Sequence, residues 1–169
     1  MISIFTDGSC IKNPGGRGGF GVIAFAPWSF TKVLYTYHEH TDSTTNNREE
    51  LKAIINAMEW SMELNADNAN FVIYTDSSYC CNSINKWMWT WAKNGWKTIK
   101  KEPVENQDLL STLYIYYTTK NLNCQVEKIK GHNEKIGNEL ADALATNNKN
   151  KFDEWIDKGG IILPDGIYF

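Results

Sequence analysis

The sequence has no run of apolar residues that approaches the roughly 20 needed to cross a bilayer. It also lacks a charged leader followed by an apolar block, because the chain starts directly with the strand-like run Ile2-Ser3-Ile4-Phe5. We therefore expect no membrane-spanning segment, no signal peptide and a cytoplasmic protein.

Cysteines are few and show no CxxC spacing of the kind that binds metals: they are Cys10, Cys80, Cys81 and Cys124. A chain of 169 residues buries enough surface to fold as one domain without disulfides, so we expect free thiols. The glycine-rich stretch 12–19 fits neither GxGxxG nor the P-loop spacing. We interpret it as a hairpin loop rather than a phosphate cradle.

Acidic residues are absent from the segment 86–101, which holds five lysines. The segment therefore carries a charge of +5, and because the net charge of the chain is −3, the remainder carries −8. Four of the seven tryptophans lie in the same segment. Lysines between aromatic side chains are typical of surfaces that bind nucleic acid, whereas a partly buried aromatic cluster covered by lysine stems is the alternative.

A short sequence occurs twice in the chain. Thr6-Asp7-Gly8-Ser9 ends one apolar, β-rich run, and Thr75-Asp76-Ser77-Ser78 ends another 69 residues later. Apolar residues at helical spacing lie between them, so the pattern predicts a strand, a helix and a second strand parallel to the first. Asp7 and Asp76 would then meet at the carboxyl edge of the sheet, where open α/β sheets bind ligands.

The rest of the pattern predicts an α/β fold. Strands over 20–26 and 31–38 would form an antiparallel meander with the first strand, and 124–130 a fifth strand. Helices are expected to start at Thr45 or Asn46, to cover 78–86, to start at Asn106, and to include 136–144. We assign 1–145 to one domain and 146–169 to a C-terminal extension whose role the sequence leaves open.

Two further acids lie on predicted helices. Glu50 lies at the edge of the apolar face of its helix, whereas Glu49 lies on the polar face, where a first-turn acid is favoured by the helix dipole. An inward carboxylate is costly unless it is paired or binds a metal. Asp142 lies on the polar side of the last helix.

Singly, each of these four acids is an ordinary surface residue, but together they predict a cation site. Two carboxylates about 4 Å apart repel by roughly 4 kcal/mol at an effective dielectric of 20, so they need cations or raised pKa values. Oxygen ligands without Cys or His select Mg²⁺ or Mn²⁺. Two such ions suit in-line displacement at phosphorus, as in nucleases.

Five motifs occur in colinear order: FTDGSC, TNNREEL, YTDSSY, NGWKT and KGHNEKIGNELADALA. Over about residues 1–145 they resemble ribonuclease H of type 1, the bacterial-type enzyme. The resemblance implies the ribonuclease H-like fold, a five-stranded mixed sheet with three antiparallel and two parallel strands flanked by helices. It implies hydrolysis of the RNA strand of RNA/DNA hybrids, leaving 3′-hydroxyl and 5′-phosphate ends. It also implies that Asp7, Glu50, Asp76 and Asp142 bind the metal and that His132 transfers a proton or assists product release.

The resemblance also implies the substrate contacts. Cys10, Asn13, Asn46 and Asn47 match the RNA strand, Trp87, Trp91, Trp96 and Lys97 match a basic aromatic protrusion over the DNA strand, and Thr45 and Asn106 match a DNA-phosphate pocket. Two departures bear on substrate affinity: Ser43 stands where that pocket commonly has arginine, and Ala92 and Asn94 make the protrusion less basic.

Two other hypotheses remain: a non-catalytic hybrid-binding domain with the same fold, and a relative that acts on duplex DNA or double-stranded RNA. The four carboxylates disfavour the first, and the tryptophan and asparagine positions disfavour the second. We expect a monomer whose partner is the RNA/DNA hybrid and which does not bind a membrane.

Overall fold

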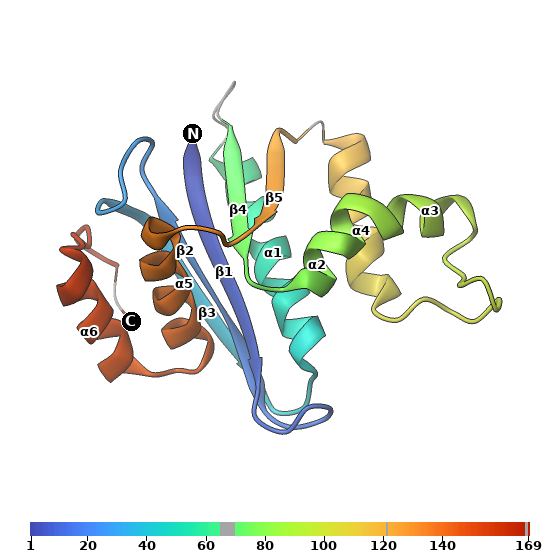
Figure 1. Ribbon diagram of the computed structural model, residues 1–169, viewed down its shortest axis with the longest axis horizontal. Coiled ribbons are helices and arrows are strands. Elements are labelled where there is room, and N and C mark those ends of the chain that lie inside the picture. Colours follow the sequence, from blue (N-terminus) through green and yellow to red (C-terminus); the bar gives the residue numbers. More distant parts are fainter. Residues whose placement is uncertain (65–69, 121, 168) are drawn as a thin grey trace.

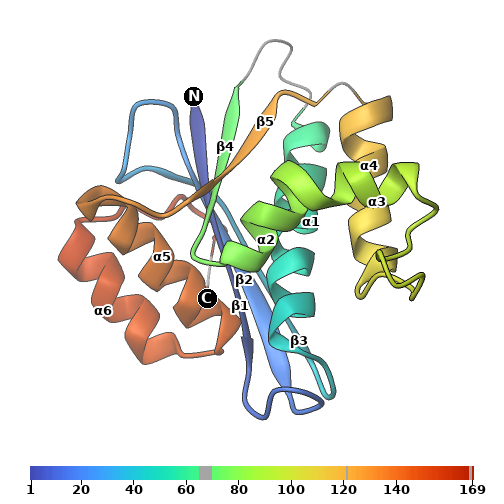
Figure 2. The same ribbon diagram turned by 45° about the vertical axis from the view of Figure 1, so that its right-hand side comes forward.

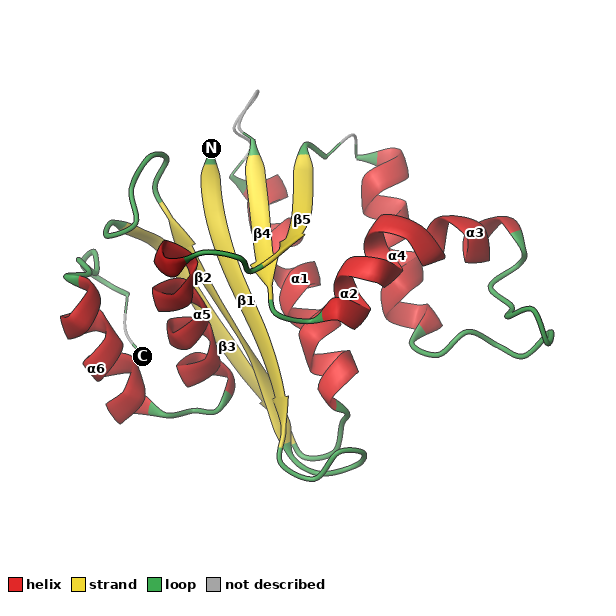
Figure 3. Cartoon of the chain, viewed as in Figure 1, coloured by secondary structure: helices red, strands yellow, loops and turns green. Residues whose placement is uncertain are grey.

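A five-stranded sheet with the strand order β3-β2-β1-β4-β5 forms the centre of the molecule (Figures 1 and 3). The computed structural model describes residues 1–64, 70–120, 122–167 and 169. The strands are β1 (Ile2–Cys10), β2 (Gly18–Phe25), β3 (Val33–Thr41), β4 (Phe71–Thr75) and β5 (Cys124–Lys128). The first three pair antiparallel, whereas β4 runs parallel to β1 and β5 parallel to β4, which confirms the predicted mixed sheet.

Helices cover both faces of this sheet (Figure 2). They are α1 (Asn46–Glu63), α2 (Ser78–Asn82), the π-helix η1 (Ser83–Trp87), α3 (Met88–Lys93), α4 (Gln107–Thr119), α5 (His132–Ala145) and α6 (Lys149–Gly159). The α1 and α4 helices lie on one side, and α5 and α6 lie on the other. In the described ranges no helix has both the length and the apolar character that a membrane span requires.

Successive residues of the central strand face opposite layers, as the pleat of a strand requires. Ile4 belongs to the same buried cluster as Ile54 of α1, and the next residue, Phe5, belongs to the cluster of Leu140 of α5; all four side chains are fully buried. The α5 helix lies very close to β1 because Gly137 faces the Phe5 ring, where a Cβ atom would lie 2.4 Å from the ring carbons. Both apolar layers are thereby anchored to β1.

Several predicted elements have other bounds than expected: β2 spans Gly18–Phe25 instead of 20–26, and β5 ends at Lys128 instead of residue 130. Two further differences have a local cause. The helix expected over 78–86 continues through η1 and α3 to Lys93, and the indole of Trp89 donates to the Ile84 carbonyl (2.9 Å), which satisfies that carbonyl within the wider π-helical turns. The strand expected over 31–38 starts at Val33, because Ser29 Oγ accepts from the backbone N–H of residues 31 and 32 and holds them in a turn.

The C-terminal segment 146–169 contributes to the second apolar layer. Its helix α6 packs along α5, and Phe152 is fully buried in the cluster that contains Phe5 and Leu140. The turn that joins the two helices is short, and Asn148 in it donates its backbone N–H to the Ala143 carbonyl (2.8 Å). The domain boundary at residue 145 stays a prediction, but side chains of 146–169 and of 1–145 pack in the same apolar cluster.

Replacing Phe152 with alanine tests how much this segment stabilises the fold. We expect Phe152→Ala to lower the free energy of unfolding by about 3–5 kcal/mol, since a fully buried aromatic side chain is lost and a cavity remains. Chemical denaturation measures the change, and Asp157→Ala, at an exposed position of the same helix, should change it by no more than about 0.5 kcal/mol. A Phe152→Ala loss as small as that of the control would contradict this role.

Candidate active site

Asp7 and Asp76 meet at one edge of the sheet because β1 and β4 are parallel and in fixed register. Phe5 pairs with Tyr74, so each aspartate lies two residues beyond a paired position. Asp7 still belongs to β1, whereas β4 ends at Thr75 and Asp76 begins the turn into α2. The placement that the repeated sequence predicted is confirmed.

Glu50 reaches the same edge from the first turn of α1. Thr45 caps this helix, its hydroxyl accepting from the backbone N–H of Arg48 (3.2 Å). The β1 backbone touches the helix at Gly8, where a Cβ atom would lie only 2.2 Å from Glu50 N. Glycine at this position therefore lets β1 and α1 bring their carboxylates together, and Glu50 is 3% exposed.

One carboxylate oxygen from each of Asp7, Glu50 and Asp76 lies within 4.8 Å of the other two. Asp142 of α5 lines the same cavity, of about 400 Å³, and Asn46 lines it as well. Glu50 Oε2 is buried and has no hydrogen-bond partner among the residues that the structure describes. A buried acidic oxygen of this kind needs a proton or a cation.

The pKa values of the cluster reflect this need. Burial raises the pKa of Asp7, and repulsion from Glu50 raises it further. Burial and the charge of Asp76 raise the pKa of Glu50, and burial raises that of Asp76. A divalent cation would offset both the burial and the repulsion, and a donor set made of oxygens alone fits Mg²⁺ or Mn²⁺.

Residues predicted to contact the RNA strand lie beside the acids. Cys10 and Asn46 line the acidic cavity, and Asn47 follows as the second residue of α1. Asn13 Oδ1 accepts from the backbone N–H of Asn46 (3.1 Å), which ties the loop after β1 to the start of α1. The cysteine is a free thiol, as expected.

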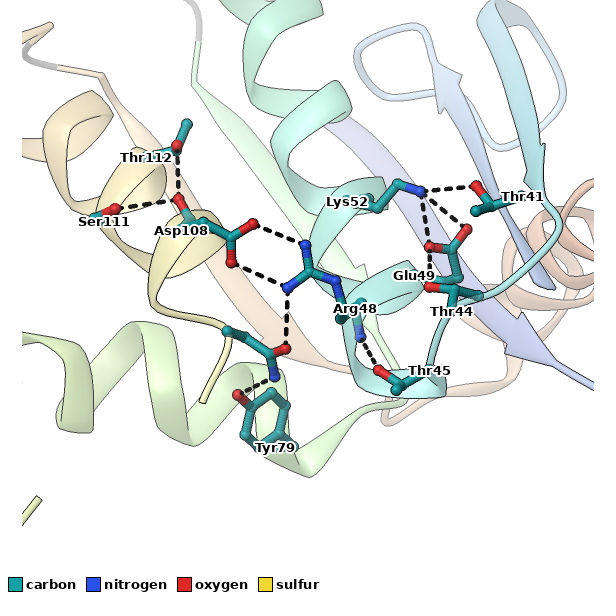
Figure 4. Close-up of polar contacts among 11 residues, drawn as sticks. Thr41, Thr44, Thr45, Arg48, Glu49, Lys52, Tyr79, Asp108, Ser111 and Thr112 are labelled. Carbon is teal, nitrogen blue, oxygen red and sulfur yellow. Dashed lines mark hydrogen bonds and ion pairs between the residues drawn. The ribbon is translucent and has the colours of Figure 1, made fainter. Parts of the chain in front are cut away.

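Arg48 connects the two residues predicted to form a phosphate pocket (Figure 4). Its guanidinium donates to both carboxylate oxygens of Asp108 (3.0 and 2.8 Å) and to Asn106 Oδ1 (3.3 Å), while its backbone N–H binds the Thr45 hydroxyl. Asn106 Nδ2 in turn donates to the Tyr79 hydroxyl (2.9 Å). Asn106 precedes α4 but its side chain does not cap it, because Arg48 and Tyr79 engage that side chain instead.

The predicted protrusion is formed by η1, α3 and the loop that follows. Trp87, Trp91 and Lys97 line a second cavity of about 590 Å³. Trp87 is 41% exposed, with its ring centroid 5.9 Å from that of Trp91, whereas Trp96 packs edge-on against Tyr114. The segment thus combines the two alternatives, since it has an open lysine-bearing surface and a half-buried aromatic cluster beneath it.

His132 is the first residue of α5, and its side chain lies outside the part of the chain that the structure describes. Glu134 fixes the start of this helix, because its carboxylate accepts from the backbone N–H groups of Lys130 (2.8 Å) and Gly131. The role expected of His132 stays a prediction.

Comparison with known proteins decides the family. The sequence profile of the RNase H family matches residues 1–150. The chain belongs to the RNase H family. Ribonuclease H of Caldicellulosiruptor saccharolyticus is 39% identical to it over 145 residues, which are 85% of this chain and 92% of the relative. Ribonuclease HI of Pasteurella multocida is 40% identical over 150 residues, 86% of this chain and 87% of the relative.

Solved structures agree with the expected RNase H-like fold. The RNase H domain of PFV in solution superposes with a TM-score of 0.72 at 26% identity, over 86% of this chain and 92% of that domain. LC9-RNase H1, a type 1 RNase H with the type 2 active-site motif, superposes with a TM-score of 0.71 at 23% sequence identity, over 98% of this chain and 88% of that chain. The foamy viral protease-reverse transcriptase in complex with an RNA/DNA hybrid superposes with a TM-score of 0.71 at 21% sequence identity, over 86% of this chain and 19% of that chain. At these last two identities the likeness shows the fold alone.

Sequence patterns missed two charged contacts in this RNase H family member. Glu49, expected on the polar face of α1, is fully buried: Lys52 Nζ lies 2.8 Å from its carboxylate, and the Thr44 hydroxyl donates to it (2.9 Å) (Figure 4). The prediction is wrong because Thr44, in the loop before α1, lies over the first turn. The second contact joins Lys151 to Asp142; these residues lie on separate helices, so helical spacing gives no signal for it.

Neutralising one acid should stabilise the metal-free protein. An acid whose folded pKa exceeds its unfolded pKa destabilises the fold as the pH rises past the unfolded value. Asp7→Asn should therefore raise the free energy of unfolding at pH 7 in EDTA by about 1–3 kcal/mol, with a smaller gain near pH 4. Saturating Mg²⁺ should stabilise the wild type more than the variant.

Denaturation with EDTA and with Mg²⁺ measures both effects. Asp153→Asn, at an exposed acid of α6, makes the same chemical change away from the cavity and serves as the control. An Asp7→Asn protein that is less stable than the wild type in EDTA would show that the carboxylates do not strain the fold.

Proposed function

We propose that the chain is a magnesium-dependent endonuclease that hydrolyses the RNA strand of RNA/DNA hybrids. The observation that carries the proposal is the cluster of Asp7, Glu50 and Asp76, with the buried, unpartnered oxygen of Glu50 within it. Relatives named Ribonuclease H and Ribonuclease HI, 39% and 40% identical, support the reaction class.

Asp7, Glu50, Asp76 and Asp142 would hold the divalent cations, with Mg²⁺ proposed and Mn²⁺ as a substitute. When bound, two such ions supply positive charge to the attacking and the leaving oxygens at the scissile phosphate. The chain contributes a fixed arrangement, since β1, β4 and the start of α1 hold their carboxylates before substrate arrives. Cleavage would leave a 3′-hydroxyl on one fragment and a 5′-phosphate on the other.

His132 would act from the first turn of α5, ten residues before Asp142 on that helix. We propose that it moves a proton during hydrolysis or assists departure of the product. Its place at the first turn suits either task, because helix ends are less constrained than helix interiors.

The hybrid would lie across the acidic cavity and the protrusion. Cys10, Asn13, Asn46 and Asn47 would contact the RNA strand, where thiol, amide and backbone groups bind 2′-hydroxyls without reading sequence. The DNA strand would be contacted by Trp87, Trp91, Trp96 and Lys97. One of its phosphates would bind to Thr45 and Asn106, which are joined through Arg48. The network around Arg48 would keep that phosphate pocket at a set distance from the acids.

A non-catalytic hybrid-binding domain is the alternative. No feature among the described residues favours it, because a binding surface for a polyanion gains nothing from buried carboxylates that repel one another.

We further propose a monomer that acts in the cytoplasm, with a catalytic unit over 1–145 and residues 146–169 as an extension of it.

Removing one ligand tests the proposal. Asp76→Asn should lower cleavage of a matched RNA/DNA hybrid in Mg²⁺ by roughly 100-fold or more, because the charge that holds the cation is lost. Hybrid binding should stay within about twofold, since the contacts with the strands remain. Asp153→Asn, with the same chemical change at an exposed site on α6, should cleave like the wild type.

The same assay on RNA duplex and DNA duplex defines the substrate. We expect cleavage of the hybrid and little of either duplex. An active Asp76→Asn enzyme would contradict the assigned chemistry, and equal digestion of all three substrates, or none of the hybrid, would contradict the assigned substrate.

A further inference from the structure

Lys151 of α6 reaches across to α5 and binds two acids there. Its Nζ atom lies 2.5 Å from Asp142 Oδ2 and 2.7 Å from Glu139 Oε2. The three side chains are between 26% and 35% exposed, so this ion pair is partly shielded from water. One of the four candidate metal ligands is thus already paired with a cation from the same chain.

The geometry of the other acids makes this pairing significant. Asp7, Glu50 and Asp76 form the cluster within 4.8 Å, and in the described ranges none of these three has an ion pair. Asp142 lines the same cavity but is not part of that cluster. Of the four acids that line this cavity, Asp142 is therefore the one that a lysine of the described chain holds.

The backbone that carries Lys151 is held in place by its surroundings. Phe152, the next residue, is fully buried, and Asn148 Oδ1 accepts from the backbone N–H of Lys151 (3.0 Å). The Thr146 backbone N–H and hydroxyl both donate to the Asp142 carbonyl (2.9 and 2.8 Å), so the turn is fastened to the end of α5. The lysine backbone therefore keeps a set position beside Asp142, and only its flexible side chain can move away.

We propose that Lys151 is a tethered counter-ion that competes with a divalent cation for the carboxylate of Asp142. A cation that coordinates this carboxylate must either displace the ammonium or bind beside it, and two positive charges near one carboxylate repel each other. Lys151 thereby weakens cation binding by the free protein. This inference rests on the proposed function, because it assumes that Asp142 is a metal ligand.

An ion pair that only fastens α6 to α5 is the simpler explanation. Such a fastening would change stability when the lysine is removed, but it would leave the affinity for cations unchanged. Competition instead predicts a change in that affinity, since removing the lysine makes the site bind its cation more tightly. Metal affinity in the absence of substrate therefore separates the two explanations.

Calorimetric titration of the hybrid-free protein with Mn²⁺ tests the proposal, with the wild type, Lys151→Met and Lys149→Met compared. Lys149 provides the matched control, because it lies on the same helix, carries the same charge and pairs with Asp153 rather than with an acid of the cavity. We expect Lys151→Met to lower the Mn²⁺ dissociation constant by about 3- to 10-fold, and Lys149→Met to leave it within about twofold. Lys151→Arg, which keeps the cation, should bind Mn²⁺ like the wild type.

The outcomes distinguish this inference from the proposed function. A wild type that binds no Mn²⁺ contradicts the proposed metal site itself. A wild type that binds Mn²⁺, with unchanged or weaker binding by Lys151→Met, overturns the competition alone. Thermal unfolding verifies that Lys151→Met is folded, and if it is not, Lys151→Gln, which keeps a hydrogen-bond donor without the charge, takes its place with the same expected direction.

Discussion

Repulsion between carboxylates that the fold forces together is the interaction on which the rest of the structure depends. The parallel register of β1 and β4 sets Asp7 beside Asp76, and the contact at Gly8 adds Glu50 from α1. Nothing in these local contacts favours three acids within 4.8 Å of one another. The apolar layers on both faces of β1 must therefore supply the free energy that holds the acids in place.

The two layers also explain how the fold orients the site. Ile4 and Phe5 anchor α1 and α5 to opposite faces of one strand, so the helices that carry Glu50 and Asp142 are positioned by the strand that carries Asp7. The short turn after α5 then places Lys151 beside Asp142. A segment beyond the last shared motif thus supplies a charge next to the acidic cavity.

Much of this arrangement was predictable from local patterns. The repeated Thr-Asp sequence and the helix between its copies predict the parallel pair, and the apolar stripe of α1 predicts that Glu50 faces inward. Each of these needs only spacing within one element, or the rule that a crossover makes strands parallel. The resemblance to the RNase H family adds the predicted substrate-contact residues. In the structure some of these lie beside the acids and others on the protrusion.

What the sequence could not predict depends on contacts between distant elements. Glu49 is buried because Thr44 and Lys52 bind it, and the side chain of Asn106 turns from its helix to Arg48 across 58 residues. The position of α6 follows from the burial of Phe152 in a cavity that strands and α5 form together. No periodicity within a single element encodes such contacts.

Diffraction from crystals soaked in Mn²⁺ tests the central claim most directly, because the repulsion among the acids can be relieved by cations or by protons. If cations relieve it, anomalous density should appear in the cavity within coordinating distance of oxygens of Asp7, Glu50 and Asp76. An empty cavity at high Mn²⁺ concentration, with these carboxyl groups hydrogen-bonded to one another as protonated acids, would contradict the account.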